Sequence, residues 1–97
     1  MIPVKRIEIV VDAPHSESIT RLLGSHGLEG WTLLRGASGM GQRGRQHDDD
    51  ITGVSSNHLI VTTCTPEKLA LLLEDLRAML ARYGGMCLVS DAHWLRH

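Results

Sequence analysis

Apolar residues along this 97-residue chain form six short patterned segments, separated by turns and by one long polar stretch. Four of the segments have the length and composition of β-strands, and they cover residues 4–11, 30–35, 57–64 and 86–91. In the other two, at 15–26 and 66–83, apolar residues recur at helical spacing. The pattern therefore predicts the order β-α-β-β-α-β, with the polar stretch between the second and third strands.

The segment 66–83 carries the clearest helical signal. Its apolar stripe is unbroken and consists of Leu69, Leu72, Leu73, Leu76, Met79, Leu80 and Tyr83. Thr65 precedes it as a capping residue, Pro66 occupies the first helical position, and two glycines follow it. In the segment 15–26, we expect Ser16 to cap the helix and Gly27 to end it.

The predicted order of elements is typical of the ferredoxin-like sandwich. This α+β fold places two helices on one face of a four-stranded antiparallel sheet, and we expect it as a single domain over residues 1–97. Its usual strand order, 4-1-3-2, puts the first strand between the third and the fourth. Cys64 and Cys87 would then lie about two strand spacings apart, roughly 9–10 Å. A disulfide requires Cα atoms within about 7 Å, so we predict two free thiols.

The polar stretch, residues 36–56, has no apolar period, and stretches of this length in a small domain are usually functional or disordered. It opens with four glycines in nine residues, and their backbone N–H groups can converge on an anion. Arg43 and Arg45 add charged donors that suit carboxylate, phosphate or bicarbonate. A solvated loop whose arginines bind nothing is the alternative. The acidic run 47–50 matches no metal-site spacing, so we predict an acidic loop tip without a metal.

Composition and charge argue against several functions. A net charge of −1 lacks the basic excess of a nucleic-acid binder. Trp31, Tyr83 and Trp94 are too scattered for a base-stacking platform. No apolar run has the length of a membrane span and the N-terminus lacks a signal-peptide layout, so we expect a cytoplasmic protein. No nucleophile–base spacing or phosphate-loop motif is present, so we predict no catalytic residues and no enzyme.

Four segments, taken in order, carry a family resemblance. They are 5–11 (KRIEIVV), 27–32 (GLEGWT), 39–44 (GMGQRG), and 89–91 (VSD) together with Arg96. In the same order, they are similar to four parts of the PII signal-transduction family: the first strand, the turn into the second strand, the Gly-Phe-Gly-Arg-Gln-Lys segment that begins the T-loop, and the fourth strand with its tail. The resemblance covers nearly the whole chain.

The resemblance implies a homotrimer with nucleotide sites in the clefts between subunits. It also implies a T-loop, here at about residues 37–56, that engages a partner protein. By position, Thr32 and Thr62 would lie near an adenine ring. The other nucleotide-binding positions, the first four beside the phosphates, would be Gly39, Gly41, Gln42, Arg43, Gly84, Gly85 and Arg96.

Three departures from the family pattern refine this expectation. The connection after the second helix has shrunk to residues 83–86 and has no lysine, which weakens binding of ATP more than that of ADP or AMP. The T-loop has no tyrosine, so uridylylation of a tyrosine there is ruled out. Arg43 stands where the family has a glutamine near 2-oxoglutarate, which leaves binding of that ligand undecided.

With these departures, the chain resembles the PII-like branch associated with inorganic carbon, including carboxysome-associated members. That resemblance implies an adenine-nucleotide sensor that also responds to bicarbonate and signals carbon and energy state through the T-loop. The implied anion-binding residues are Gly41, Gln42, Arg43 and Arg45. The implied partner is a bicarbonate transporter or a carboxysome-related protein.

Two alternatives on the same scaffold stay open at this point. A small nucleotide-hydrolysing enzyme would reveal itself by turnover of ATP or ADP. A metal-responsive trimer of the CutA-like kind would be stabilised by metals and not by nucleotides. An RNA-recognition module shares the order of elements, but it needs aromatic residues on the first and third strands, and these strands have none.

Overall fold

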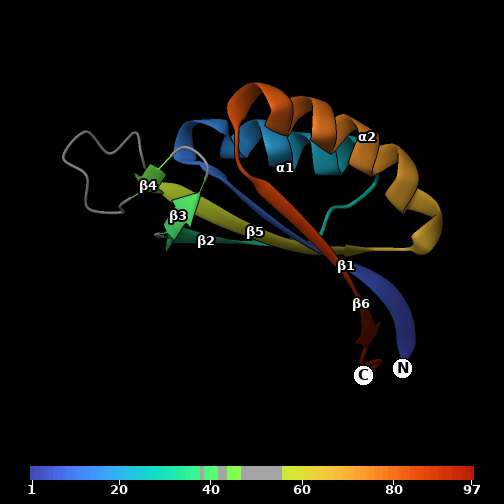
Figure 1. The fold of residues 1–97 in the computed structure, drawn as a ribbon. Helices are drawn as coiled ribbons and strands as arrows, with labels where there is room; N and C mark the ends of the chain where they lie inside the picture. The colour runs from blue at the N-terminus through green and yellow to red at the C-terminus, as the bar shows by residue number, and fades with distance from the viewer. Residues whose placement is uncertain (38, 42–43, 47–55) are drawn as a thin grey trace.

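The computed structural model describes residues 1–37, 39–41, 44–46 and 56–97. Its main elements follow the predicted order, with two short strands added inside the polar stretch (Figure 1). In chain order, they are β1 (Ile2–Asp12), the 3-10 turn η1 (Ala13–His15), α1 (Ser16–Ser25), β2 (Trp31–Ala37), β3 (Gly39–Gly41), β4 (Gly44–Gln46), β5 (Asn57–Cys64), α2 (Pro66–Tyr83) and β6 (Met86–Trp94).

The four long strands form one antiparallel sheet in the order β2-β5-β1-β6. This order confirms the predicted arrangement, because β1 lies between β5 and β6. Ile9 marks the register: it pairs with Ile60 on one side and with Cys87 on the other. Both helices cover the same face of the sheet and leave the opposite face bare (Figure 1).

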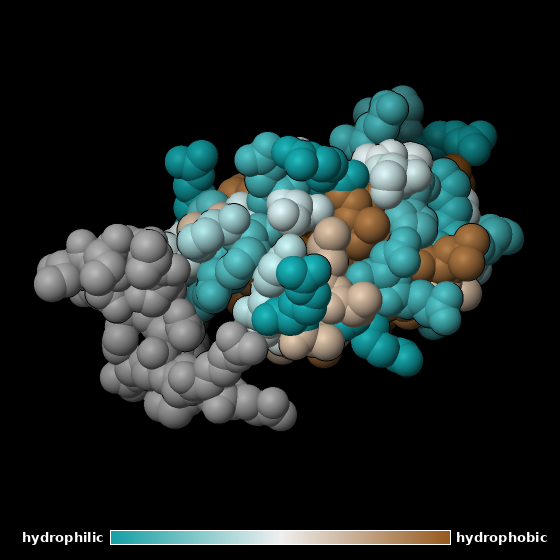
Figure 2. Space-filling model, turned by 90° about the horizontal axis from the view of Figure 1, so that it is seen from above, coloured by the Kyte–Doolittle hydropathy of each residue, from teal (hydrophilic) through white to brown (hydrophobic). Residues whose placement is uncertain are grey.

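The core lies between the sheet and the two helices. Alternate residues of β1 point into it, and they meet Ile60 of β5 and the apolar faces of α1 and α2. The fully buried side chains are Ile7, Ile9, Val11, Ile19, Leu23, Ile60, Leu72 and Leu76. Seen from the helix side, much of the outer surface is polar (Figure 2). The predicted stripe of α2 is therefore the packed face of that helix.

The start of α1 differs from the prediction. Pro14 is the second residue of the η1 turn, α1 begins at Ser16, and His15 rather than Ser16 occupies the N-cap position. The hydroxyl of Ser16 donates to the carbonyl oxygen of Ala13 at 3.0 Å and accepts no N–H of the helix, so the predicted cap is wrong. Thr65 does hold the N-cap position of α2, but without a side-chain cap bond. Gly27, with φ of 81°, takes the left-handed conformation that ends α1, as predicted.

The outer strands are longer than their sequence patterns indicate. β2 runs to Ala37 through a bulge at Gly36, where φ is 79°. β6 runs to Trp94, which pairs with Ile2, so half of the predicted tail 92–97 is strand. Together β1 and β6 extend beyond the sheet as a two-stranded ribbon that ends at the chain termini (Figure 1).

Both cysteines are free thiols, as predicted. Cys64 of β5 pairs with Lys5 of β1, whereas Cys87 of β6 pairs with Ile9 on the other side of β1. Burial raises the pKa of both thiols, which lowers their thiolate fraction near neutral pH. We therefore expect the native protein to react slowly with a thiol reagent such as DTNB, and faster as the pH rises. Protein unfolded in guanidinium is the control. If both thiols of the native protein reacted as fast as those of the unfolded protein, the burial of the thiols would be contradicted.

Candidate functional site

An open groove of about 730 Å³ lies at the corner of the sheet where β2 begins. Its volume is in the range of pockets that hold small-molecule ligands. The α1–β2 connection, the start of β2, the end of β5 and the first turn of α2 form its walls, and Trp94 of the ribbon also lines it. Thr32 and Thr62, the two residues expected near an adenine ring, both line this groove.

The two threonines have different environments. Thr62 pairs with Ile7 and faces the helices, where it is 4% exposed and donates its hydroxyl to the carbonyl oxygen of Gly30 at 2.7 Å. Thr32 pairs with Val61 and faces the other side of the sheet, where it is exposed. The Thr62 hydroxyl is thus committed to holding the α1–β2 connection, while Thr32 is accessible from the groove.

Lys68 adds a positive charge to the groove. It lies in the first turn of α2 and folds back over the α1–β2 connection. Its Nζ atom is 2.9 Å from the position that a Cβ of residue 27 would take; the end of this flexible side chain could move aside, so the positive φ of Gly27 is the reason for glycine there. In the part of the chain that the structure describes, no acidic side chain forms an ion pair with Lys68.

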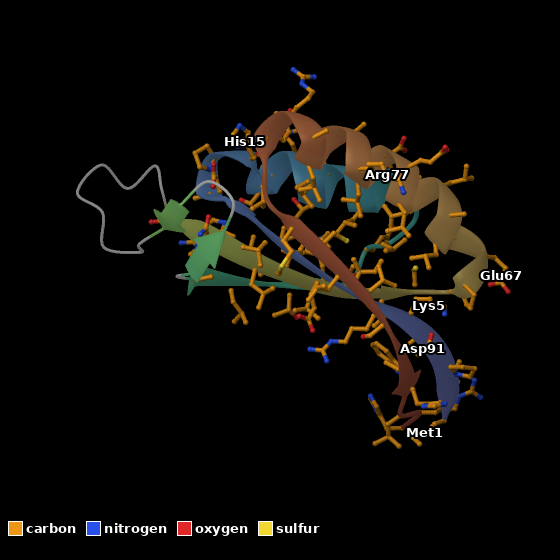
Figure 3. All side chains as sticks on the ribbon, viewed as in Figure 1. Met1, Lys5, His15, Glu67, Arg77 and Asp91 are labelled. Carbon is orange, nitrogen blue, oxygen red and sulfur yellow. The ribbon has the colours of Figure 1, made fainter. Side chains whose placement is uncertain are left out.

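An ion pair joins β1 and β6 where the ribbon leaves the sheet. Lys5 of β1 and Asp91 of β6 point toward one another from neighbouring strands (Figure 3). The hydrogen bond and the charge of Lys5 lower the pKa of Asp91. Asp91 is 83% exposed, so solvent screens this pair and it contributes little to stability.

Gly84 and Gly85 form the complete connection between α2 and β6. Both have positive φ, 82° and 115°, and the N–H of Gly84 closes α2 on the carbonyl oxygen of Leu80 at 2.8 Å. A Cβ on Gly85 would overlap the carbonyl oxygen of Val10 and lie 3.2 Å from a methyl group of Leu80. The turn therefore requires Gly85 whether or not a nucleotide approaches its backbone.

The glycine-arginine segment contains an element that the sequence did not predict. Gly39–Gly41 and Gly44–Gln46 pair as a β-hairpin, in which Gly39 faces Gln46 and Gly41 faces Gly44. Arg45 lies on its second strand, whereas Gln42 and Arg43 lie outside the described residues. The anion-binding role of this segment stays a prediction.

The predicted site residues fall into two sets at opposite ends of the sheet (Figure 1). The part of the sheet that carries Thr32, Thr62 and the ribbon leading to Arg96 is called the groove end. We call the loop end the part with Gly84, Gly85 and the β3–β4 hairpin. Thr32 and Ala37, which lies just before the hairpin, are five residue steps apart, roughly 17 Å of extended strand. One chain therefore does not bring the two sets together.

The sheet face opposite the helices is apolar at the loop end. Val10 pairs with Leu59 and Met86, and Leu59 pairs with Leu34, so these four side chains form one row. Leu34 is 52%, Met86 45% and the neighbouring Leu88 53% exposed. Contiguous exposed apolar surface of this kind marks an interaction site.

Sequence reasoning missed three groove residues, Trp31, Trp94 and Lys68. In the sequence the two tryptophans are far apart and indicate no common site, yet both line one groove in the structure. Lys68 carries no sequence signal, since a lysine in the first turn of a helix is ordinary. A count of aromatic residues near the predicted turn into β2 could have pointed to Trp31.

The fold and the long insertion between β2 and β5 are those expected of a protein of the PII type. A family model described as nitrogen regulatory protein P-II matches residues 4–97, so the chain belongs to this family. A search of curated protein sequences gave no significant match.

Solved structures agree with this assignment. The chain is similar to CPII, a nitrogen regulatory PII-like protein from Thiomonas intermedia solved with ADP, AMP and bicarbonate. The TM-score is 0.89 and the identity 26%, over 97% of this chain and 90% of that one. GlnK of B. subtilis in complex with ATP (TM-score 0.62, 15% identity, 95% and 84% covered) shares the fold. So does CutA of Synechococcus elongatus (0.67, 9%, 95% and 85%).

Two further observations bear on the predicted function. Neither helix of the described chain is long and apolar enough to cross a membrane. Within residues 1–37 and 56–97, and in the hairpin strands, no three His, Cys, Asp or Glu side chains are grouped in a way that could hold a metal ion.

Proposed function

We propose that this protein is a trimeric, non-enzymatic sensor that binds an adenine nucleotide and bicarbonate in the clefts between its copies. The observation that carries this proposal is the likeness, over nearly the whole chain, to a PII-like protein solved with ADP, AMP and bicarbonate. The groove end supports it, since Thr32 and the positively charged Lys68 both line the groove there.

Assembly supplies what one chain lacks. The groove end of one copy and the loop end of the next together make a complete cleft, with the base against the former and the phosphates against the latter. The apolar row of Val10, Leu34, Leu59 and Met86 is the surface that the copies bury. A chain of 97 residues has a small core, so this burial also stabilises the fold.

The short α2–β6 connection sets the preference for ADP and AMP over ATP. Gly84 and Gly85 are its only residues, and neither carries a cationic side chain for a third phosphate. Bicarbonate binds beside the phosphates, at Gly41, Gln42, Arg43 and Arg45. The planar guanidinium of Arg43 suits this small planar anion.

The T-loop, about residues 37–56, transmits the signal. Ligands shift it between states, which requires that they bind these states with different affinity. Its partner in the cytoplasm is a bicarbonate transporter or a carboxysome-related protein, and the acidic residues Asp48, Asp49 and Asp50 tune that contact. We assign no catalytic step to the protein.

Titration with ADP, in the presence and absence of bicarbonate, tests the proposal. We expect Arg43→Ala to weaken ADP binding by about tenfold or more and to abolish the bicarbonate effect, because a charged hydrogen-bond donor is lost. Arg21→Ala is the matched control, since Arg21 lies on the outer surface of α1 and pairs with Glu17. Identical titration curves for Arg43→Ala and the wild type, with both ligands, would contradict the proposed binding of ADP and bicarbonate at Arg43.

A further inference from the structure

The indole ring of Trp31 lines the groove and takes no part in the core. Trp31 is the first residue of β2, and it is 43% exposed. It belongs neither to the buried cluster nor to the apolar residues packed against it. Among the residues that the structure describes, its ring stacks on no other aromatic ring and on no cation. A large apolar ring is thus presented to the groove without an aromatic or cationic partner among the described residues.

The position of this ring is well determined by its surroundings. Trp31 pairs with Thr62 across the β2–β5 ladder, and Thr62 also holds the carbonyl oxygen of the preceding Gly30. The connection before it is closed by Gly27 at the end of α1 and by the side chain of Lys68 that lies over it. A ring fixed in this way loses little conformational freedom when a ligand packs against it.

We infer that Trp31 is the aromatic wall against which the base of the nucleotide stacks. This inference rests on the proposed nucleotide site and names the residue that determines its preference for a flat aromatic base. Thr32, expected near the adenine ring, is the next residue; the two side chains lie on opposite faces of the edge strand β2, and both line the same groove. Base–aromatic stacking is tolerant of base identity, so Trp31 selects for the presence of a base, and other groups must distinguish adenine from other bases.

Trp94 provides a matched control within the same groove. It is 51% exposed and also lines the groove, but it stands on the ribbon, paired with Ile2. Along β1, Ile2 is five residues from Ile7, the partner of Thr62, a distance of roughly 17 Å. Trp94 is therefore remote from Thr32 along the sheet, and we assign it no stacking role. Because these are the only two tryptophans, each can be observed alone.

Fluorescence and calorimetric titration with ADP test the inference. In Trp94→Phe, where Trp31 is the only tryptophan, we expect ADP to quench the emission; in Trp31→Phe we expect no comparable change. We expect Trp31→Ala to bind ADP about 5–150-fold more weakly, the range measured for removal of one stacking ring. Trp31→Phe, which keeps an aromatic face, should stay within about threefold of the wild type.

A probe without a base separates this inference from the proposed function. Inorganic pyrophosphate should bind the wild type and Trp31→Ala equally, because Trp31 does not contact phosphate. Equal ADP affinity in Trp31→Ala and wild type, or an unquenched Trp31 in Trp94→Phe while ADP binds, would overturn the inference alone. Equal weakening of pyrophosphate and ADP in Trp31→Ala would also overturn it, since the ring would then have a general structural role. Failure of the wild type to bind any adenine nucleotide would instead overturn the proposed function.

Discussion

Gly85→Ala is expected to destabilise the protein by about 2–4 kcal/mol, from a strained backbone combined with a steric clash. The residue has φ of 115°, which an L side chain rarely adopts, and its added Cβ would overlap the carbonyl oxygen of Val10. Val10 belongs to β1, which is paired with β5 and β6, so its backbone cannot move away cheaply. Urea and thermal unfolding of the purified variant measure the effect.

Gly24→Ala is the matched control for this substitution. Gly24 lies in the last turn of α1, its φ is not positive, and an added Cβ would meet no atom within 4 Å. Alanine at a helix interior is favoured over glycine by about 0.5–1 kcal/mol, so this variant should be slightly more stable than the wild type. An unfolding midpoint for Gly85→Ala equal to that of the wild type would show that the α2–β6 turn is not held as described.

Leu88→Lys is expected to turn the assembled protein into a monomer and to weaken ADP binding by about tenfold or more. Leu88 is 53% exposed on the bare face of the sheet, directly opposite Glu8 of β1. In a single chain, the new ammonium group would face a carboxylate, so the substitution is tolerated there. Between two copies, the contact would have to desolvate the new ammonium group beside the Arg6–Glu8 ion pair, which costs several kcal/mol.

Light scattering combined with calorimetric ADP titration measures both consequences of Leu88→Lys. Leu71→Lys is the control, because Leu71 is 67% exposed on α2, away from the bare sheet face. The control should assemble and bind ADP as the wild type does. If Leu88→Lys kept the wild-type mass, the bare face would not be the contact between copies. If the monomer bound ADP with full affinity, the site would not be divided between chains.

The sequence predicted β5 and α2 with their observed bounds because local and tertiary signals coincide there. Asn57–Cys64 is apolar and β-branched, and Pro66 and Gly84 bracket an unbroken stripe. The sequence did not predict the last third of β6, since Ala92, His93 and Trp94 have no alternation. Their pairing with Val4, Pro3 and Ile2 makes them a strand, and such long-range pairing has no local signature.

The candidate site was predictable only in part. Thr32 and Thr62 both line the groove because strands 2 and 3 are neighbours in the predicted sheet, although their side chains face opposite sides of it. Lys68 and Trp31 belong to elements that meet only through packing, so no spacing in the sequence joins them. For Gly85, the sequence indicates a glycine turn but not why glycine is required there. The carbonyl oxygen of Val10 leaves no room for a Cβ, and the sequence does not reveal this contact.

The separation of the groove end from the loop end has a consequence for the number of sites. In a closed ring of identical copies joined head to tail, each cleft takes its two halves from two different chains. The number of clefts then equals the number of chains, and every chain borders two clefts. In the proposed assembly, a nucleotide in one cleft would hold the groove end of one chain, whose loop end borders the next cleft. The sheet that joins the two ends of a chain would then be a direct physical link between neighbouring sites.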